Sequence, residues 1–309
     1  FEAAIAGELP ASLNDAVNVH KKAMSADASK LATRQASGAA LEVLNATIPE
    51  IIGGSADLTG SVNTKIKEAT PVDASNYGGN YLHYGVREFG MAAVMNGLAL
   101  HGGFIPYGGT FLVFADYLRG ALRLSALMGL RVVYVLTHDS IGLGEDGPTH
   151  QPVETVASLR AVPNLNVFRP ADAVETAECW QTAMESAGTP SAMVLTRQGL
   201  VTVRTAHSAE NLSAKGAYVL AESDGDRQAT ILATGSEVEI AMTAREVLQA
   251  DGVPTAVVSM PAWNLFDAQD KTYRDGVLGS GVRVAIEAAV QMGWDKYIGS
   301  NGLSIGLDH

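Results

Sequence analysis

The chain has 309 residues, of which 47% are apolar and 17% are charged, and its formal net charge is -12. This length permits two domains, and the composition supports large apolar cores and argues against a disordered chain. The acidic balance argues against nucleic acid and anionic membranes as partners. A small phosphorylated ligand is still compatible with it, because such a ligand needs only a few well-placed cations.

The single cysteine, Cys179, leaves no internal disulfide to form and fits a reducing compartment. No apolar run reaches the length of a membrane span, so we expect a soluble, cytoplasmic protein.

Both ends predict a fragment of a longer protein: no initiator methionine precedes Phe1, and the final GLSIGLDH is typical of the middle of a helix or strand. Residues 1–25 are polar and helix-prone without a buried pattern, which predicts an interdomain linker.

Strands and helices are expected to alternate in residues 26–200. In chain order we predict a helix at 29–44, a strand at 51–54, a polar stretch at 60–85, a helix from about 87, a turn at 106–109, a helix at 111–127, a strand at 131–137, a helix at 153–159, a strand at 165–168, a helix at 175–187 and a strand at 191–196. The helix after residue 110 would place Phe111, Phe114 and Tyr117 at i, i+3 and i+6.

The alternation resumes after a polar stretch at 201–226, which we predict to be a linker. Strands are expected at 229–233, 257–258 and 282–286, with a helix after Gly235-Ser236-Glu237. Such alternation predicts an α/β fold of two domains, 26–200 and 227–309, with mainly parallel sheets flanked by helices. The second of these domains is expected to be incomplete.

Four polar motifs directly follow predicted strands: SAD (55–57), THDS (137–140), TRQ (196–198) and TGSE (234–237). In open α/β sheets, ligands bind in the crevice outside the carboxyl ends of the strands. The four motifs therefore predict a ligand site at that edge.

The loop 137–153, THDSIGLGEDGPTHQPV, is the richest of these segments. It carries five ionisable side chains among three glycines and follows an apolar run: His138, Asp139, Glu145, Asp146 and His150. His138, Asp146 and His150 could ligate a metal, although their spacing lacks the i, i+4 pattern of familiar zinc motifs. Hydrogen bonding to a polyhydroxylated substrate is the favoured interpretation, and a metal hydrolase is the alternative.

Glu88 lies near a predicted helix start, where the helix dipole alone favours a glutamate. Its apolar neighbours would instead favour a protonated carboxyl group, suited to sharing a proton with a nitrogen heterocycle. The aromatic residues at 111, 114 and 117 could be a core stripe or a cofactor cage. Arg34 and Arg197 are isolated in the sequence, and arginine is the natural clamp for a phosphate.

Taken together, the motifs resemble the transketolase family, thiamine-diphosphate enzymes of the pentose phosphate pathway. The resemblance rests on IGGSADLTGS (52–61), YGVREFGM (84–91), PYGGTFLVFADY (106–117), THDSIGLGEDGPTHQPVE (137–154), NVFRPAD (166–172), LTRQ (195–198), ATGSEVE (233–239) and SMPAWNLFDAQ (259–269). It covers nearly the whole chain, and it implies a pyrimidine-binding domain plus part of a C-terminal domain, both α/β.

The resemblance implies transfer of a two-carbon ketol unit from a ketose phosphate to an aldose phosphate through thiamine diphosphate. Glu88 matches the glutamate that hydrogen-bonds N1′ of the cofactor's aminopyrimidine, and it is the first expected catalytic residue. The other implied cofactor contacts are Asp57, Phe111, Phe114 and Tyr117. The implied substrate contacts are Arg34, Ser61, His138, Asp146, His150 and Arg197, of which His150 is also expected to be catalytic.

The family's GDG-type motif, which holds the diphosphate through a divalent metal, has no counterpart here, since Asp224-Gly225-Asp226 lies in a predicted linker. We therefore expect no metal ligand in this chain. Mg²⁺ or Ca²⁺ would come with a separate N-terminal diphosphate-binding domain, without which the chain would be inactive, and the assembly would be a homodimer. The alternatives are dihydroxyacetone synthase, deoxyxylulose-phosphate synthase and a non-catalytic transketolase-like partner subunit.

Overall fold

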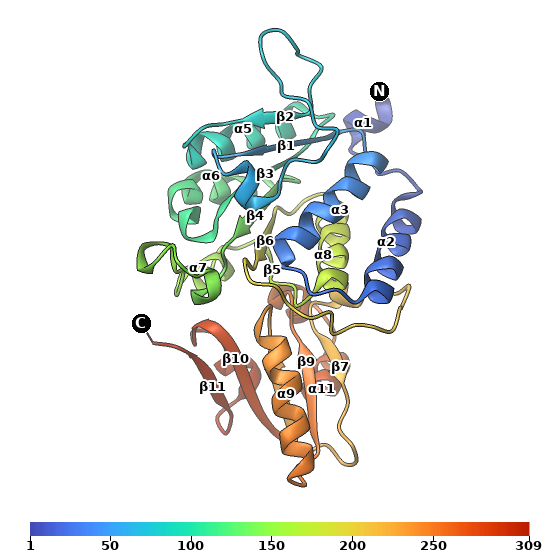
Figure 1. Ribbon diagram of the computed structural model, residues 1–309, viewed down its shortest axis with the longest axis vertical. Helices are drawn as coiled ribbons and strands as arrows, with labels where there is room; N and C mark the ends of the chain where they lie inside the picture. Colours follow the sequence, from blue (N-terminus) through green and yellow to red (C-terminus); the bar gives the residue numbers. More distant parts are fainter. Residues whose placement is uncertain (309) are drawn as a thin grey trace.

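The computed structural model describes residues 1–308, which form two domains, each built on its own sheet (Figure 1). In the first domain, the strands are β1 (Ile51–Ser55), β2 (Tyr81–His83), β3 (Ile105–Phe111), β4 (Val133–Thr137), β5 (Asn166–Phe168) and β6 (Ser191–Leu195). Its helices are α1 (Glu2–Ala6), α2 (Leu13–Asp27), α3 (Thr33–Thr47), α4 (Thr59–Val62), α5 (Glu88–His101), α6 (Ala115–Met128), α7 (Thr155–Arg160) and α8 (Ala173–Glu185).

The second domain has the strands β7 (Tyr218–Ala221), β8 (Ala229–Ala233), β9 (Thr255–Ser259), β10 (Val282–Val290) and β11 (Leu303–Leu307). Its helices are α9 (Glu237–Ala250), α10 (Trp263–Asp267), α11 (Lys271–Leu278) and α12 (Asp295–Ile298). His309, the last residue of the predicted C-terminal domain, lies outside the described residues. In the part of the chain that is described, no helix combines the length and the apolar character that crossing a membrane requires.

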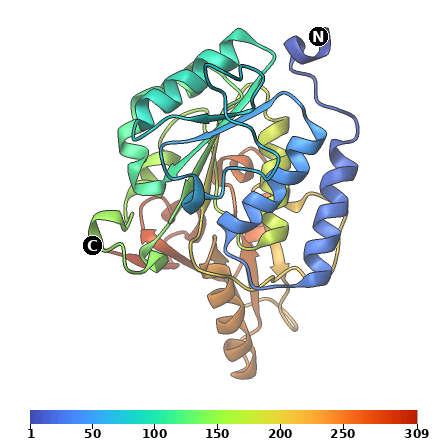
Figure 2. The same ribbon diagram turned by 45° about the horizontal axis from the view of Figure 1, so that its top comes forward.

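The first sheet has the order β2-β1-β3-β4-β6-β5, and all of its neighbouring strands are parallel. Helices α2, α3 and α8 cover one face, while α5 and α6 cover the other (Figures 1 and 2). Along β4, Val133 and Val135 join the first of the two resulting cores, and Tyr134 and Leu136 join the second. Because both faces are covered, the whole of β4 is buried, and its sequence is an apolar run without alternation.

The second sheet has the order β11-β10-β8-β9-β7. Its strands are parallel except for β7, which runs antiparallel to β9 at one edge. Apolar residues of α9 pack against one face, and the other face carries a cluster rich in aromatic side chains that includes Trp263, Phe266 and Trp294. The predicted α/β architecture with mainly parallel sheets is confirmed.

The turn predicted at 106–109 is wrong, because these residues belong to strand β3 and the following α-helix begins only at Ala115. The glycines that suggested a turn are required for close packing instead. A Cβ at Gly108 would lie 2.5 Å from the sulfur of Met95, and one at Gly109 would lie 2.5 Å from a methyl carbon of Thr64. Glycine inside a strand commonly marks such a close approach.

The expectation that residues 1–25 carry no buried pattern is also wrong. Helix α2 buries one side chain per turn, at Leu13, Val17, Lys21 and Ser25, and it packs on α3 and α8. Two of these four residues are polar, which hid the helical periodicity in the sequence. The short strands β2 and β7 were missed as well, within the stretches predicted to be a polar loop and a linker. The domain limits at 25/26 and 226/227 stay predictions.

Candidate functional site

The parallel strands of the first sheet are paired in a register that aligns the carboxyl ends of its central strands at one edge. Ser55 of β1 is paired with Gly109 of β3, Phe111 at the end of β3 with Thr137 of β4, and Thr137 with Leu195 of β6. The residues that follow these strand ends are therefore neighbours in space. This arrangement is what the strand-end motifs predict.

Glu88 is the first residue of α5, as expected, and its side chain is buried. Its Oε1 accepts a hydrogen bond from the Thr110 hydroxyl at 3.3 Å, the only one that residues 1–308 provide to this carboxylate. The expected apolar neighbourhood is only partly present, because Met91 is buried but Val86 and Phe89 are exposed. The chain turns these two side chains outward, so within this chain they do not shield the carboxylate from water.

The aromatic residues form a continuous row, but they do not lie on one helix. Phe111 ends β3, Phe114 lies in a 3₁₀ turn, and Tyr117 lies in the first turn of α6, so the predicted helical spacing is wrong. The rings of Phe111 and Phe114 are nearly parallel at 4°, with centroids 5.8 Å apart. The Tyr117 ring lies 5.9 Å from Phe114 and is largely exposed to solvent. The row starts one residue after Thr110, whose hydroxyl group binds Glu88.

His138 follows β4 with a left-handed backbone, φ 59°, and is only 3% exposed. Its ring stacks on Phe111 with centroids 3.7 Å apart, and its Nδ1 lies 2.8 Å from the Thr137 hydroxyl. The ring of His150 stands edge-on to Phe114 at 5.4 Å. The two histidines predicted from the loop thus lie against the same pair of phenyl rings.

The charged residues predicted to hold a phosphate lie near these histidines. Arg34 donates from Nη1 to the carbonyl oxygen of Ser61 at 2.6 Å, so Ser61 binds Arg34 through its backbone. Burial lowers the pKa of Arg34, Arg197 lowers it as well, and Asp146 acts in the opposite direction. Because these charges influence one another, Arg34, Arg197 and Asp146 lie around one region.

Asp57 lies at the same edge of the sheet, but its side chain does not bind the other predicted residues. It follows β1 with a left-handed backbone, φ 65°, and its side chain is exposed. It makes no side-chain hydrogen bond to any other residue of the described chain. The structure thus leaves its carboxylate open to solvent at the edge of the sheet.

Two charged residues received no role from the sequence. Glu145 pairs with Arg197 at 2.8 Å, although the two are 52 positions apart. Arg169 directly follows β5 and binds Asp139, the neighbour of His138, at 2.9 Å. The sequence pattern could have identified Arg169 as a candidate. Like the other strand-end motifs, it is a charged residue directly after a buried strand.

The metal alternative receives no support from the arrangement of these side chains. Among residues 1–308, no group of three or more His, Cys, Asp and Glu residues is placed to hold a metal ion. His138, Asp146 and His150 are instead arranged around aromatic rings and arginines. A hydrolase that relies on a metal held by these three residues is therefore not what the geometry favours.

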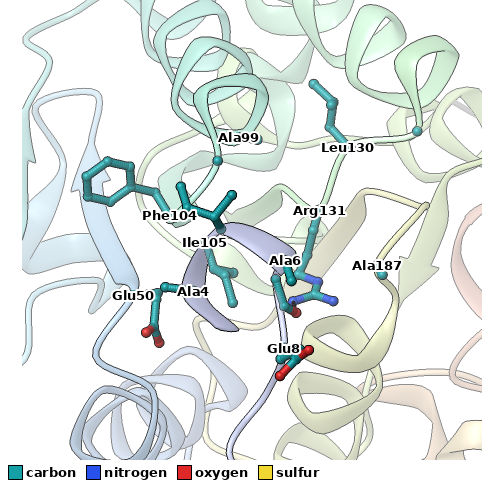
Figure 3. A pocket seen from close by; sticks show the side chains of 15 residues that line it. Ala4, Ala6, Glu8, Glu50, Ala99, Phe104, Ile105, Leu130, Arg131 and Ala187 are labelled. Carbon is teal, nitrogen blue, oxygen red and sulfur yellow. Dashed lines mark hydrogen bonds between the residues drawn. The ribbon is translucent and has the colours of Figure 1, made fainter. Parts of the chain in front are cut away.

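A cavity of about 200 Å³ lies at the opposite edge of the sheet, where β3 and β4 begin (Figure 3). Its walls include Ala6, Phe104 and Arg131. Arg131 reaches towards α1 and donates to the carbonyl oxygen of Gly7 at 2.9 Å. None of the predicted site residues is part of these walls, so this cavity belongs to the packing of α1 and not to the strand-end site.

The protonation state of His138 tests this geometry. Burial and then the Arg34 guanidinium lower the pKa of His138 from 6.5 to about 4, although Asp146 acts in the opposite direction. The unfolded chain binds this proton first, so the folded chain loses stability as the pH falls from 6.5 towards 4. In an NMR titration, we expect the ring to remain neutral down to about pH 5, and Arg34→Gln to raise the midpoint.

The control for this titration is Arg123→Gln, an exposed arginine of α6 that is not among the main influences on the pKa of His138. This variant should leave the His138 midpoint unchanged. A midpoint near 6.5 in the unaltered chain would contradict the buried, arginine-flanked position.

Family models match both domains of this chain. One described as "Transketolase, pyrimidine binding domain" matches residues 29–202, and one described as "Transketolase-like TK C-terminal domain" matches residues 216–309. A transketolase of Sinorhizobium medicae (strain WSM419) is 59% identical over 308 residues, which are 99% of this chain and 44% of that protein. The chain thus spans less than half the length of such curated relatives, 44% to 46% for the most similar ones.

Solved structures agree with the sequence matches. A transketolase from Leishmania mexicana has a TM-score of 0.92 and 44% identity, covering 100% of this chain and 44% of that chain. A split-gene transketolase, in the form of an inactive tetramer, has a TM-score of 0.74 and 26% identity, covering 91% of this chain and 90% of that chain. With both domains matched, the strand-end site formed and relatives at more than half identity, the chain belongs to the transketolase family.

Proposed function

We propose that this chain forms the pyrimidine side of a thiamine-diphosphate site and takes part in two-carbon ketol transfer between sugar phosphates. The observation that carries the proposal is the buried Glu88 carboxylate, which binds Thr110, the residue directly before the stacked Phe111–Phe114 pair. Thr110 occupies only Oε1, which leaves Oε2 able to bind a ring nitrogen. A flat apolar wall next to a carboxylate with a free oxygen fits a planar nitrogen heterocycle.

Thiamine diphosphate, when bound, supplies the carbon nucleophile that accepts the two-carbon unit. Glu88 then shares a proton with the ring nitrogen N1′, and the phenyl rings of Phe111 and Phe114 fix the plane of the heterocycle. We also assign Asp57 and Tyr117 to the cofactor side. Both of them are exposed next to this surface, where a second protein surface could cover them.

The substrate side is assigned to the two histidines and the arginines. Since Nδ1 of His138 already bonds the Thr137 hydroxyl, a neutral His138 keeps Nε2 to donate or accept one hydrogen bond, which suits a sugar hydroxyl group. We assign His150, which is less buried and lies beside Phe114, to proton exchange with the sugar, and Asp146 to accepting a hydrogen bond from a hydroxyl group. Arg34, with the adjacent Ser61, and Arg197 are assigned to the phosphate, which would compete with Glu145 for Arg197.

The proposed partners are a diphosphate-binding domain, which would bring Mg²⁺ or Ca²⁺, and a second copy of the chain. An exposed apolar surface on α5 and α6 supports a protein partner, since surfaces of this kind mark interaction sites. It is formed by Phe89, Val94, Leu100, Tyr117, Leu124 and Leu127. The two helices form one surface, because a Cβ at Gly120 of α6 would lie 3.4 Å from the Phe89 ring of α5.

We place the reaction among cytoplasmic pentose phosphates, in line with the one unpaired cysteine.

The purified 309-residue chain, supplied with thiamine diphosphate and Mg²⁺, is expected to show no ketol transfer. The physical reason is that the chain would contribute only the pyrimidine side of the site, since no group of His, Cys, Asp and Glu among residues 1–308 is placed to hold the metal. Adding a separately expressed diphosphate-binding domain of a transketolase should restore turnover, measured as aldose-dependent consumption of a ketose phosphate. The solved split-gene transketolase, of nearly the same span and inactive as a tetramer, supports this expectation.

Turnover by the chain alone would contradict the proposal. Failure of every complementing domain to restore turnover, in a complex shown to form, would instead favour the alternative of a non-catalytic partner subunit.

A further inference from the structure

A buried charge network joins the two domains next to the His138 loop, and Arg169 is at its centre. Arg169 is 1% exposed, and its Nε donates to Oδ2 of Asp139 at 2.9 Å. Its Nη1 donates to the backbone oxygen of Thr234 at 3.0 Å and to the Thr234 hydroxyl at 2.9 Å, and it also pairs with Glu237. One guanidinium therefore binds the first domain with one edge and the second domain with the other.

The second domain is shaped to receive this arginine. The backbone N–H of Arg169 donates to the carbonyl oxygen of Pro261 at 2.9 Å, and its carbonyl oxygen accepts from Gly235 N–H at 3.0 Å. Gly235 has a left-handed backbone, φ 53°, and a Cβ there would lie 2.9 Å from Cγ of Arg169. The Thr234 hydroxyl in turn donates to Glu287 at 2.5 Å. Arg169 is thus held on its backbone and its side chain by residues of the second domain.

Within residues 1–308, Arg169 is the only residue whose side chain binds Asp139. Its Oδ2 accepts from Arg169, and its Oδ1 is buried without a hydrogen-bond partner among the described residues. The preceding residue, His138, holds a left-handed backbone, which costs an L-residue about 1 kcal/mol and persists only where the surroundings enforce it. With this backbone conformation, the His138 ring stacks on Phe111.

We propose that Arg169 is a positioning residue for the substrate side of the site: held by the second domain, it anchors Asp139 and thereby sets the backbone and ring of His138. The second domain then contributes to substrate binding without contacting the substrate. The catalytic consequence rests on the proposed function, because it requires that His138 contacts the sugar. The geometric consequence for His138 does not.

A matched pair of variants separates positioning from general stability. In Arg169→Lys, a single ammonium group cannot bind Asp139 and the Thr234–Glu237 side at once, as the planar guanidinium does. The control is Arg204→Lys, which weakens another buried ion pair, that of Arg204 with Glu178 at 2.6 Å. Neither member of that control pair is among the main influences on the pKa of His138. Both variants are to be studied in the full chain complemented by the diphosphate-binding domain.

For Arg169→Lys, we expect KM for the ketose phosphate to rise about tenfold or more, with affinity for thiamine diphosphate within about twofold of the unaltered complex. The His138 ring resonances should shift, and their titration midpoint should move from about 4 towards 6.5. Arg204→Lys should lower the urea midpoint of unfolding while leaving KM and the His138 resonances unchanged. If Arg169→Lys behaves as Arg204→Lys does, Arg169 is only a structural residue and the inference is overturned.

Asp139→Asn decides the same question if Arg169→Lys does not fold, because it keeps Arg169 on the second domain and removes only the charge that anchors the loop. It should shift the His138 resonances in the same direction, and unchanged resonances would again overturn the inference. If the unaltered complex shows no ketol transfer, the proposed function fails, while the NMR comparison still decides whether Arg169 positions His138.

Discussion

Glu88→Ala, in the chain complemented by a diphosphate-binding domain, is expected to lower kcat for ketol transfer by about 10²- to 10⁴-fold. The carboxylate is the group proposed to share a proton with N1′, and the other carboxylates expected to contact the cofactor or the substrate, Asp57 and Asp146, are exposed. The fold should survive, because Glu88 loses only the hydrogen bond from Thr110, at a cost of about 1 kcal/mol. The measurements are steady-state kinetics and urea unfolding of the same preparation.

Two controls accompany this substitution. Glu88→Gln keeps the shape of the side chain but carries no negative charge, so it should lose most of the activity with the fold intact. Asp15→Ala removes an exposed carboxylate from the first turn of another helix, α2, and should leave turnover unchanged. Retention of more than a tenth of the activity by Glu88→Ala would remove Glu88 from the mechanism and weaken the assignment of the cofactor surface.

Glu178→Ala is expected to destabilise the folded chain by about 3–5 kcal/mol, the cost of leaving buried charges without a partner. Glu178 is fully buried on α8 and pairs with two cations, Lys21 of α2 at 2.7 Å and Arg204 at 2.6 Å. The same carboxylate accepts hydrogen bonds from the backbone and side chain of Ser213. Without it, both cations are left in the interior without an anionic partner. The free energy of unfolding should be measured in urea at neutral pH.

The pH dependence of this pair has a definite sign. Burial acts to raise the pKa of Glu178, but Arg204 and Lys21 outweigh it and hold the pKa below the ordinary value of 4.5. A depressed carboxyl pKa contributes stability above 4.5, and this contribution is lost as the pH falls through the folded-state pKa. The unaltered chain should therefore lose stability below about pH 4.5 more steeply than Glu178→Ala does.

Glu185→Ala, an exposed glutamate on the same helix, is the matched control and should change stability by less than about 0.5 kcal/mol. Adding Lys21→Met to Glu178→Ala should recover part of the loss, because it removes one of the stranded cations. Equal effects of Glu178→Ala and Glu185→Ala would show that the buried pair does not anchor α2. Such a result would restore the interpretation of residues 1–25 as a linker without a packing role.

The edge of the sheet that carries the site was predictable because its signals are local. A strand buried on both faces appears in the sequence as an apolar run, and the polar motif after it marks the carboxyl end. The motif at 137–140 follows β4 and that at 196–198 follows β6, and the two strands are neighbours in the sheet. Glu88 at a helix start was predictable for the same reason, since a helix boundary depends on nearby residues.

The start of α6 shows where local reasoning fails. Phe111, Phe114 and Tyr117 have helical spacing, yet they lie in a strand, a 3₁₀ turn and a helix. The strand extends to Phe111 because Gly108 allows the side chains of Met91 and Met95 to pack against it. Those methionines lie on a different element, so their influence is not visible in the sequence around position 108.

The sequence by itself determined the alternation of strands and helices, the edge of the sheet at which the polar motifs meet and most of the residues gathered there. Only the tertiary structure decided which charges meet: Arg169 with Asp139 and Glu237, 30 and 68 positions away, and Lys21 with Glu178. The physical reason is that periodicity encodes which face of an element is buried. An ion pair depends on strand order, register and the reach of two side chains, which exist only once the sheets are assembled.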